Sequence, residues 1–326
     1  MSVSKTHIIK SMRVGGKLMK KIGALIILLS GFVASGSLYA AAPLVDAGWI
    51  KSNSCDDNVR VLDIRNPIDG GSRTDYLKGH VPCAVYTDYL KGGWRAGVDK
   101  VPGQLPPTDK IAKLIGDLGI DNKTHVVIYH FGKSAVDLGS ATRVYWTFKV
   151  LGHDNVSILN GGYLGYISDK ANPVEKGNNK VEPKMFTAKL RQNMMASASD
   201  VKAAIGDGKT QLVDLRPQHQ FIGINRHGKS KRNGTIPGAK NLPESWMTVN
   251  GGGTLRGKDQ LASLYQLANV NPDGDQINFC NTGHWASLGW FVSSEVMGNT
   301  NAKLYDGSMV EWSGMPDMPM ETAVNF

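Results

Sequence analysis

The two halves of the chain carry the same series of short motifs in the same order. Five motifs of the first half each match one of the second: residues 61–65 with 212–216, 79–84 with 234–239, 127–130 with 277–280, 150–152 with 296–298, and 160–163 with 306–309. A repeat that spans most of a chain indicates one structural unit used twice. The sequence therefore constrains the fold to two similar domains in tandem.

Each half alternates short apolar strands with helical stretches, of which residues 110–118 and 259–268 are examples. This alternation is typical of an α/β unit with a mainly parallel sheet flanked by helices. In the second half, Ser199 and Asp200 precede a helical stretch at residues 201–205. We expect this pair to form the N-cap of the first helix there.

A polar segment separates the two halves. Residues 169–184 are rich in glycine, proline and asparagine, a composition that indicates a linker. A chain of 326 residues has room for two domains. We therefore expect one α/β domain at residues 43–168 and a second at residues 185–326.

The first forty residues differ from the rest. Lysines precede an apolar stretch at residues 22–33, and small residues follow up to Ala40. This pattern predicts a signal peptide over residues 1–40, and hence a periplasmic protein that leaves the membrane after cleavage. The alternative is a membrane anchor, but a spanning helix needs about twenty apolar residues. Translation from Met1 or from Met19 gives the same mature chain.

Net charge gives little support for a nucleic-acid partner. The formal charge is +9, and the leader holds six basic residues and no acidic residue, which leaves a mature charge of +3. So small an excess does not indicate a polyanion partner without a clustered patch. The local basic cluster at residues 226–232 is either a solvated loop or a funnel for small anions.

The chain has three cysteines. In an exported protein two cysteines can pair and the third is then a candidate reactive thiol. We expect Cys280 to be the free thiol, while Cys55 and Cys83 either form a disulfide or remain separate thiols. The eight histidines and three cysteines show no paired-ligand spacing, so we expect no metal and no cofactor.

Cys280 follows an apolar strand at residues 276–279 and precedes a tight loop and a helical pattern. A thiol in this place faces the unpaired N–H groups and the positive end of a helix, which favour a thiolate. The arrangement predicts a nucleophile. The alternative is a buried structural cysteine.

Four motifs together resemble those of the tandem rhodanese-domain sulfurtransferases, the group that contains thiosulfate and 3-mercaptopyruvate sulfurtransferases. They are the strand at residues 213–216, the turn at 234–239, the loop beginning at Cys280, and the closing run at 305–312. The resemblance implies two rhodanese-like domains, of which the first is catalytically silent and carries His130 in place of the cysteine.

The resemblance also implies a reaction. Cys280 would take a sulfane sulfur from a small anionic donor of the thiosulfate or 3-mercaptopyruvate type, hold it as a persulfide, and pass it to cyanide, a thiol or a protein acceptor. The alternative is a periplasmic sulfur carrier without efficient turnover of its own. A phosphatase on the same fold would need an arginine to close the loop, and no arginine follows Cys280.

We expect a six-residue loop from Cys280 to Trp285 whose N–H groups point inward and stabilise the persulfide anion. Gly283 allows the loop to curl. Asn281 and Thr282 either contact the sulfur or face solvent. The first copy carries four more residues between its loop and the matching Gly152, so we expect that it does not form the same cradle.

Two further loop residues each have two interpretations. His284 departs from both loop types of the family: it either presents a partial charge or moves a proton at the site, or it points outward. Trp285 either forms the floor of the substrate pocket or packs against the core.

An anionic donor calls for cationic partners, and arginine binds such groups through a planar fork. Arg216, Arg226 and Arg232 are the candidates. Arg216 has a second interpretation, a structural ion pair with Asp214. Arg226 follows a Phe-x-Gly run, after which the mercaptopyruvate branch carries a substrate-binding arginine.

Overall fold

The structure is a computed structural model that describes residues 41–324. The predicted signal peptide lies outside the described residues. Within residues 41–324, no helix is long and apolar enough to cross a membrane.

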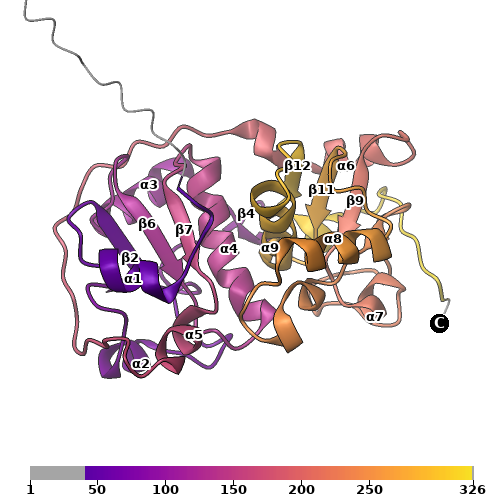
Figure 1. Cartoon of the computed structure of the whole chain (residues 1–326). Coiled ribbons are helices and arrows are strands. Elements are labelled where there is room, and N and C mark those ends of the chain that lie inside the picture. Colours follow the sequence, from indigo (N-terminus) through magenta and orange to yellow (C-terminus); the bar gives the residue numbers. More distant parts are fainter. Residues whose placement is uncertain (1–40, 325–326) are drawn as a thin grey trace, which may run out of the picture. The chain divides into compact units, whose positions relative to one another are not determined.

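The first domain is built on a five-stranded parallel sheet (Figure 1). Its strands, in sheet order, are β1 (Leu44–Val45), β7 (Val156–Leu159), β6 (His125–Tyr129), β2 (Val59–Asp63) and β3 (Val85–Tyr86). Every neighbouring pair is parallel. Parallel neighbours need crossover connections, which the helices of this domain provide.

The second domain repeats this sheet. Its parallel strands, in the matching order, are β8 (Met195–Ala196), β12 (Ala302–Tyr305), β11 (Gln276–Phe279), β9 (Gln211–Asp214) and β10 (Lys240–Asn241). In both sheets the strands follow the order first, fifth, fourth, second, third. The prediction of two copies of one α/β unit is confirmed.

Helices flank both sheets (Figure 1). Those of the first domain are α1 (Ala47–Asn53), α2 (Arg73–Lys78), α3 (Thr108–Asp117), α4 (Ala135–Val150) and α5 (Gly162–Ser168). Those of the second are α6 (Ala198–Ala204), α7 (Gln218–Phe221), α8 (Lys258–Leu267), α9 (His284–Phe291) and α10 (Ser308–Trp312). Short 3-10 helices lie at Gln192–Met194, Glu244–Met247 and Val249–Gly251, and a π-helical turn at Val292–Val296 extends α9.

The two helices expected at residues 110–118 and 259–268 are α3 and α8. The expected N-cap at Ser199 is wrong. The N-cap of helix α6 is Ser197, two residues earlier, because Ser197 and Asp200 form a reciprocal capping box in which each side chain accepts the other's backbone N–H. The segment at residues 169–191, all of it described, contains no helix and no strand.

Helices α4 and α9 pack against each other and join the two domains. Both are buried on nearly all sides, as expected for a helix that is apolar around its whole circumference. Gly139 of α4 leaves space for His284, and Thr142 and Ser287 share a hydrogen bond of 2.9 Å across the contact. One apolar core contains residues of both domains.

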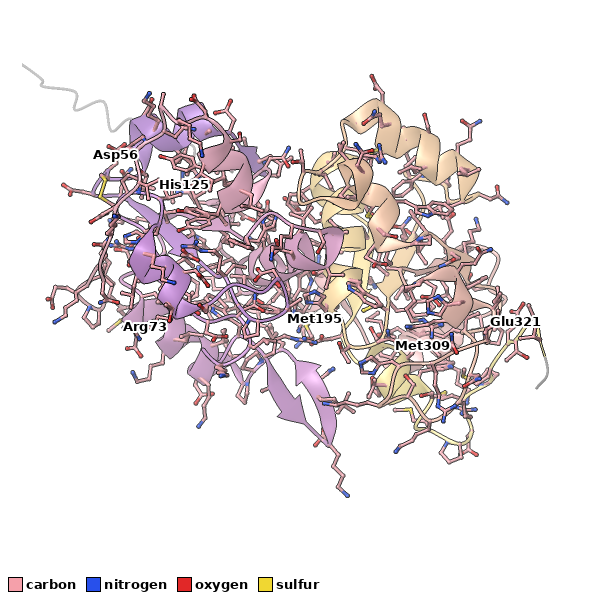
Figure 2. All side chains as sticks on the ribbon, turned by 90° about the horizontal axis from the view of Figure 1, so that it is seen from below. Asp56, Arg73, His125, Met195, Met309 and Glu321 are labelled. Carbon is pink, nitrogen blue, oxygen red and sulfur yellow. A yellow bond between two sulfur atoms is a disulfide. The ribbon has the colours of Figure 1, made fainter. Side chains whose placement is uncertain are left out.

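Each domain also donates a backbone hydrogen bond to a loop of the other domain. An antiparallel hairpin, β4 (Ala96–Val98) and β5 (Val101–Gln104), extends from the first domain as the pair of violet arrows in Figure 2. Just beyond the hairpin, the N–H of Leu105 in the first domain donates to Asp306 of the second at 2.7 Å. In the opposite direction, the N–H of Leu255 in the second domain donates to Asn160 of the first at 2.9 Å. Asn160 and Asp306 are matching positions of the repeat. Each domain therefore holds the loop region of the other.

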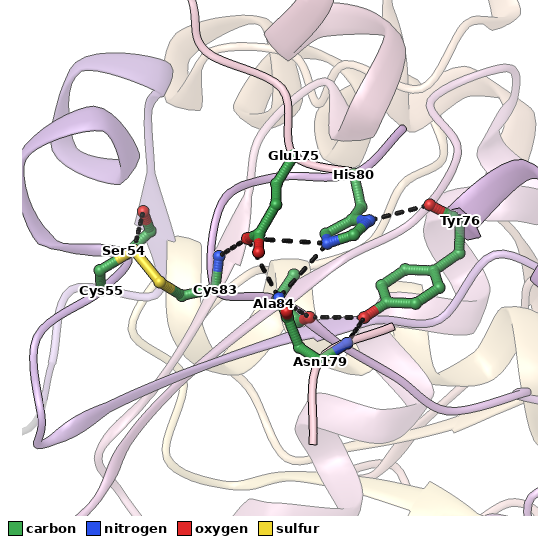
Figure 3. Close-up of a disulfide and its surroundings, with 8 residues drawn as sticks. All are labelled: Ser54, Cys55, Tyr76, His80, Cys83, Ala84, Glu175 and Asn179. Atoms are coloured by element: carbon green, nitrogen blue, oxygen red, sulfur yellow. Dashed lines mark hydrogen bonds and ion pairs between the residues drawn. A yellow bond between two sulfur atoms is a disulfide. The ribbon is translucent and has the colours of Figure 1, made fainter. Parts of the chain in front are cut away.

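A disulfide joins Cys55 and Cys83, whose Cα atoms are 5.2 Å apart (Figure 3). Cys83 has a φ of 61°, in the left-handed region that favours glycine, and its counterpart in the repeat is Gly238, with a φ of 75°. The Cys83 N–H donates to Glu175, which also lies 3.7 Å from His80. The disulfide, the turn and the segment that leaves the first domain are thus held together.

Candidate active site

Cys280 lies where β11 ends and α9 is about to begin. β11 is the central strand of the second sheet and is buried along its whole length. Only 1% of the Cys280 surface is exposed, and with the other two cysteines in a disulfide it is the free thiol of the chain. The sulfur therefore sits at the carboxyl edge of a parallel sheet, where α/β proteins place their ligands.

The loop after Cys280 is shorter than expected. Three residues, Asn281 to Gly283, separate the cysteine from α9, so the predicted six-residue loop to Trp285 is wrong. Gly283 ends the loop as the N-cap of α9 with a φ of 71°, and His284 and Trp285 form the first helical turn. The N–H groups of that turn have no acceptor within the helix, so they add hydrogen-bond donors to those of the loop.

Ser308 holds the loop through hydrogen bonds to two of its N–H groups. Its hydroxyl oxygen accepts the N–H of Cys280 at 3.1 Å and the N–H of Gly283 at 3.2 Å, and the hydroxyl donates to Tyr305 O at 2.8 Å. Ser308 has a φ of 50°, while its counterpart in the repeat is Gly162, with a φ of 60°. A residue with a Cβ is strained in this region, and the two bonds to the loop account for its presence.

The N–H groups of the matching loop in the first domain bind a carboxylate. The N–H groups of Phe131 and Lys133 donate to the carboxylate of Asp137 at 3.2 and 2.9 Å, and the Gly132 N–H donates to the same carboxylate. We expected that the first copy does not form the same cradle as the second. Its loop is one residue longer, and its N–H groups are already bound to a carboxylate of its own helix.

The four extra residues of the first copy are now located. One lies in the loop, and three lie in the helix, where α4 has 16 residues against 13 in α9 and its π-helical turn. The first turn of α9 contains no acidic residue that could play the part of Asp137. In the second domain no carboxylate of the first helical turn can therefore take the place that Asp137 takes in the first. His130, at the cysteine's position, is buried and donates from Nε2 to Gly253 O at 3.0 Å.

An arginine of the first domain reaches the Cys280 loop. Arg143, from α4, is fully buried and donates to Gly283 O at 3.1 Å and to Asp306 Oδ1 at 2.5 Å. The Asp306 carboxylate stabilises the charged guanidinium, so the pKa of Arg143 is raised despite its burial. A Cβ on Gly283 would approach both Arg143 and Asp306 to 2.5 Å. Glycine is therefore required here by its neighbours as well as by its backbone.

His284 takes a different position from the two that we expected. It is buried against the first domain, where Nδ1 accepts from the Tyr89 hydroxyl at 2.7 Å and Nε2 donates to Val136 O at 2.8 Å. Burial, and the charge of Arg95 nearby, lower its pKa to about 3. The imidazole is thus neutral at pH 7 and both of its nitrogens are occupied, so it presents no charge to a donor.

Comparison with known proteins agrees with this geometry. The family model described as the rhodanese-like domain matches residues 46–169 and again residues 197–315. The chain is a tandem rhodanese-domain protein of the thiosulfate/3-mercaptopyruvate sulfurtransferase family. The rhodanese fold expected from the sequence is confirmed.

Several relatives match nearly the whole chain. The sulfur carrier protein TtuD of Thermus thermophilus is 30% identical over 288 residues, covering 85% of this chain and 95% of the relative. The 3-mercaptopyruvate sulfurtransferase of Escherichia coli K12 is 28% identical and the coverage is 85% and 97%. The thiosulfate sulfurtransferase of Bos taurus is 30% identical, with coverage of 84% and 92%. The crystal structure of SseA from Escherichia coli superimposes with a TM-score of 0.70 at 27% identity, over 82% of this chain and 99% of SseA.

The other residues of the second rhodanese loop have clear surroundings. The Asn281 side-chain N–H donates to Gln220 at 2.9 Å, and Asn281 Oδ1 is buried without a partner. Thr282 is half-buried and its carbonyl oxygen accepts from Arg95. Trp285 is half-buried and packs against the core that the two domains share.

The three arginines proposed from the sequence have other partners. Arg216 is buried and forms an ion pair of 2.6 Å with Asp214. The first rhodanese domain has the same pair, so Arg216 is a partner in a structural ion pair, the second of its two expected roles. Arg226 is exposed and bonds to Ser230 and Asn233 in its own segment. Arg232 donates to four carbonyl oxygens near the C-terminus.

A cavity of about 430 Å³ opens beside the loop, between the hairpin of the first rhodanese domain and the basic cluster of the second. Thr282 of the loop, Arg95 of the hairpin, and His227 and Lys229 of the cluster contribute to its wall. Burial and the charge of Lys229 lower the pKa of His227. Within residues 41–324, no group of three or more His, Cys, Asp or Glu side chains is arranged to hold a metal ion.

Sequence reasoning missed Arg95, Arg143 and Ser308. The two arginines lie 185 and 137 residues before Cys280 in the other domain, and no local pattern relates them to the loop. Ser308 did have a signal in the sequence: where the first half of the repeat has Gly162, the half that carries the candidate nucleophile has a serine. A polar side chain at a position that favours glycine indicates a specific role.

Proposed function

We propose that the protein is a sulfurtransferase that carries sulfur as a persulfide on Cys280, from an anionic donor of the thiosulfate or 3-mercaptopyruvate type to a thiol or cyanide. The observation that supports this most is the pair of matching loops. In the first domain the loop amides bind the Asp137 carboxylate, whereas in the second no acidic residue stands in the first turn of α9 and a free thiol ends the strand.

The proposed reaction has two steps. In the first, the Cys280 thiolate attacks the outer sulfur of the donor: a new S–S bond forms, the donor's bond to that sulfur breaks, and its electron pair leaves with the remainder, as sulfite or as the enolate of pyruvate. In the second, an acceptor attacks the outer sulfur, and the electron pair of the S–S bond returns to Cys280 as a thiolate.

The loop stabilises the intermediate. The N–H groups of residues 281 and 282 and of the first turn of α9 are the donors available to a terminal persulfide anion. Ser308 fixes the loop through the N–H groups of Cys280 and Gly283. Donors held in place before the charge develops cost no reorganisation when it does.

The test is an assay of thiocyanate formation from thiosulfate and cyanide, beside pyruvate release from 3-mercaptopyruvate. We expect Cys280→Ser to abolish transfer with both donors and His130→Ala to retain it. Activity that survives in Cys280→Ser would reject the proposal.

The relative named a sulfur carrier supports a second candidate, a carrier that delivers persulfide to a protein acceptor. The two differ in turnover. A carrier would form the Cys280 persulfide with a donor and show no catalytic release to cyanide or small thiols.

We also propose that the chain is exported to the periplasm and cleaved after Ala40. Support comes from the leader pattern and from the Cys55–Cys83 disulfide, a bond that persists in oxidising compartments. N-terminal sequencing of the protein released by osmotic shock tests this: a first residue of Ala41 is expected, and an intact leader in the cytosolic fraction would contradict it.

A further inference from the structure

Arg95 differs from the other arginines around the Cys280 loop in how its charge is balanced. Arg143 and Arg216 each form a buried ion pair with an aspartate. The Arg95 guanidinium instead donates to two carbonyl oxygens, Gly103 O at 3.0 Å and Thr282 O. In the part of the chain that the structure describes, no carboxylate lies within 4 Å of it. Arg95 therefore keeps an unneutralised positive charge next to Thr282, the second residue after the nucleophile.

This charge faces a cavity that suits an anion. Arg95 and Lys229 contribute positive charge to the cavity wall, and none of the residues that line it is an aspartate or a glutamate. The apolar part of the wall comes from Leu90, Ala96 and Pro102. The volume of about 430 Å³ falls in the range of small-molecule sites. A half-buried arginine with free N–H groups in such a place recognises carboxylate or sulfonate oxygens.

We infer that Arg95, a residue of the domain without the cysteine, determines the preference of this site for anionic donors, and that the anionic group of the donor binds in the cavity beside Thr282. The inference rests on the proposed function. Arg95 fixes the loop through Thr282 O and attracts the donor's negative charge with its remaining N–H groups. The first domain thus supplies the cation that the residues directly after Cys280 lack.

Alkylation of Cys280 tests the inference without sulfur transfer. Iodoacetate and iodoacetamide have nearly the same shape and differ by one negative charge, and Cys280 is the free thiol of the chain. We expect Arg95→Gln to lower the ratio of the iodoacetate rate to the iodoacetamide rate about tenfold, as the loss of one nearby charge predicts. Arg95→Lys should restore most of that ratio.

The matched control is Lys100→Gln, which removes an exposed charge from the tip of the same hairpin. Because exposed charges are screened by salt, this variant should keep the ratio within about twofold of the wild-type value. An unchanged ratio in Arg95→Gln, or an equal fall of both rates, would overturn the inference. An equal fall would show that Arg95 only holds the loop.

Donor kinetics separate this inference from the proposed function. Arg95→Gln should raise the KM for thiosulfate and for 3-mercaptopyruvate about tenfold, with kcat within about threefold, because the lost attraction acts on binding. If the wild-type chain transfers no sulfur while the alkylation ratio still depends on Arg95, the proposed function fails, and what stands is that Arg95 attracts anions to Cys280. A normal KM in Arg95→Gln would overturn the inference and leave the function intact.

Discussion

Removal of the Arg143 guanidinium should damage both the stability of the chain and the Cys280 loop. Arg143→Met keeps the apolar length of the side chain and removes the charge. It leaves Asp306, whose side chain is 6% exposed, without its ion pair at a place where water cannot replace it. Breaking a buried pair by removing one partner costs about 3–5 kcal/mol. For a chain of this size, we expect the melting temperature to fall by roughly 10 °C.

The same substitution releases the loop. Arg143 donates to Gly283 O at the end of the loop and to Gly103 O in the hairpin, so its loss removes one donor from each of these carbonyl oxygens and leaves Gly103 O with Arg95 alone. A displacement of about 1 Å at a reacting centre can cost about a hundredfold in rate. We therefore expect sulfur transfer by the folded variant at 25 °C to fall by roughly that factor.

A double-mutant cycle in urea unfolding measures the pair directly. Asp306→Asn retains an oxygen for the Leu105 N–H and removes the charge, so Arg143→Met with Asp306→Asn should recover about 2 kcal/mol relative to additive single changes. The control is Arg191→Met, whose partner Asp154 is half-exposed, and which should cost about 1 kcal/mol or less. If the two single changes are additive, or Arg143→Met costs no more than the control, the argument is wrong.

Two further outcomes follow from the structure. Gly283→Ala should lower the free energy of unfolding by several kcal/mol and remove most of the activity, because a Cβ there meets Arg143 and Asp306 and the backbone is left-handed. Gly298 also has a left-handed backbone but lies in open space, so Gly298→Ala should cost only about 1 kcal/mol in the same urea titration. Burial raises the pKa of Glu244 from 4.5 to about 7, so the folded state binds this proton more tightly than the unfolded state does. The shift contributes about 3 kcal/mol to the free energy of unfolding below pH 4.5, and this contribution is lost as the pH rises through 7. Glu244→Gln should therefore make the free energy of unfolding depend less on pH between 4.5 and 7, and an unchanged slope of that free energy against pH would contradict this.

The sequence predicted the fold well because each signal was local. Strand-length apolar runs, helical periodicity and the repeated motifs depend on neighbours in the chain, and they placed Cys280 correctly between β11 and α9. The exact start of α9 depended on the backbone conformation of Gly283, which a glycine permits but does not impose.

The surroundings of the thiol were harder to predict because they come from the other domain. His284 is a polar residue beside a nucleophile, and nothing in its own segment shows that Tyr89 and Val136 occupy both of its nitrogens. Arg95 likewise approaches the loop only because the hairpin and the helices α4 and α9 pack together. Contacts between residues more than a hundred positions apart leave no periodic signal in one sequence.

In the proposed reaction, Cys280 holds the transferred sulfur. The most direct measurement is the mass of the intact mature protein after brief incubation with thiosulfate or 3-mercaptopyruvate and removal of the donor, followed by peptide mapping. We expect the added mass of one sulfur atom on the peptide that contains Cys280, lost on treatment with cyanide and absent in Cys280→Ser. Added sulfur that maps to Cys55 or Cys83, or that persists in Cys280→Ser, would contradict it.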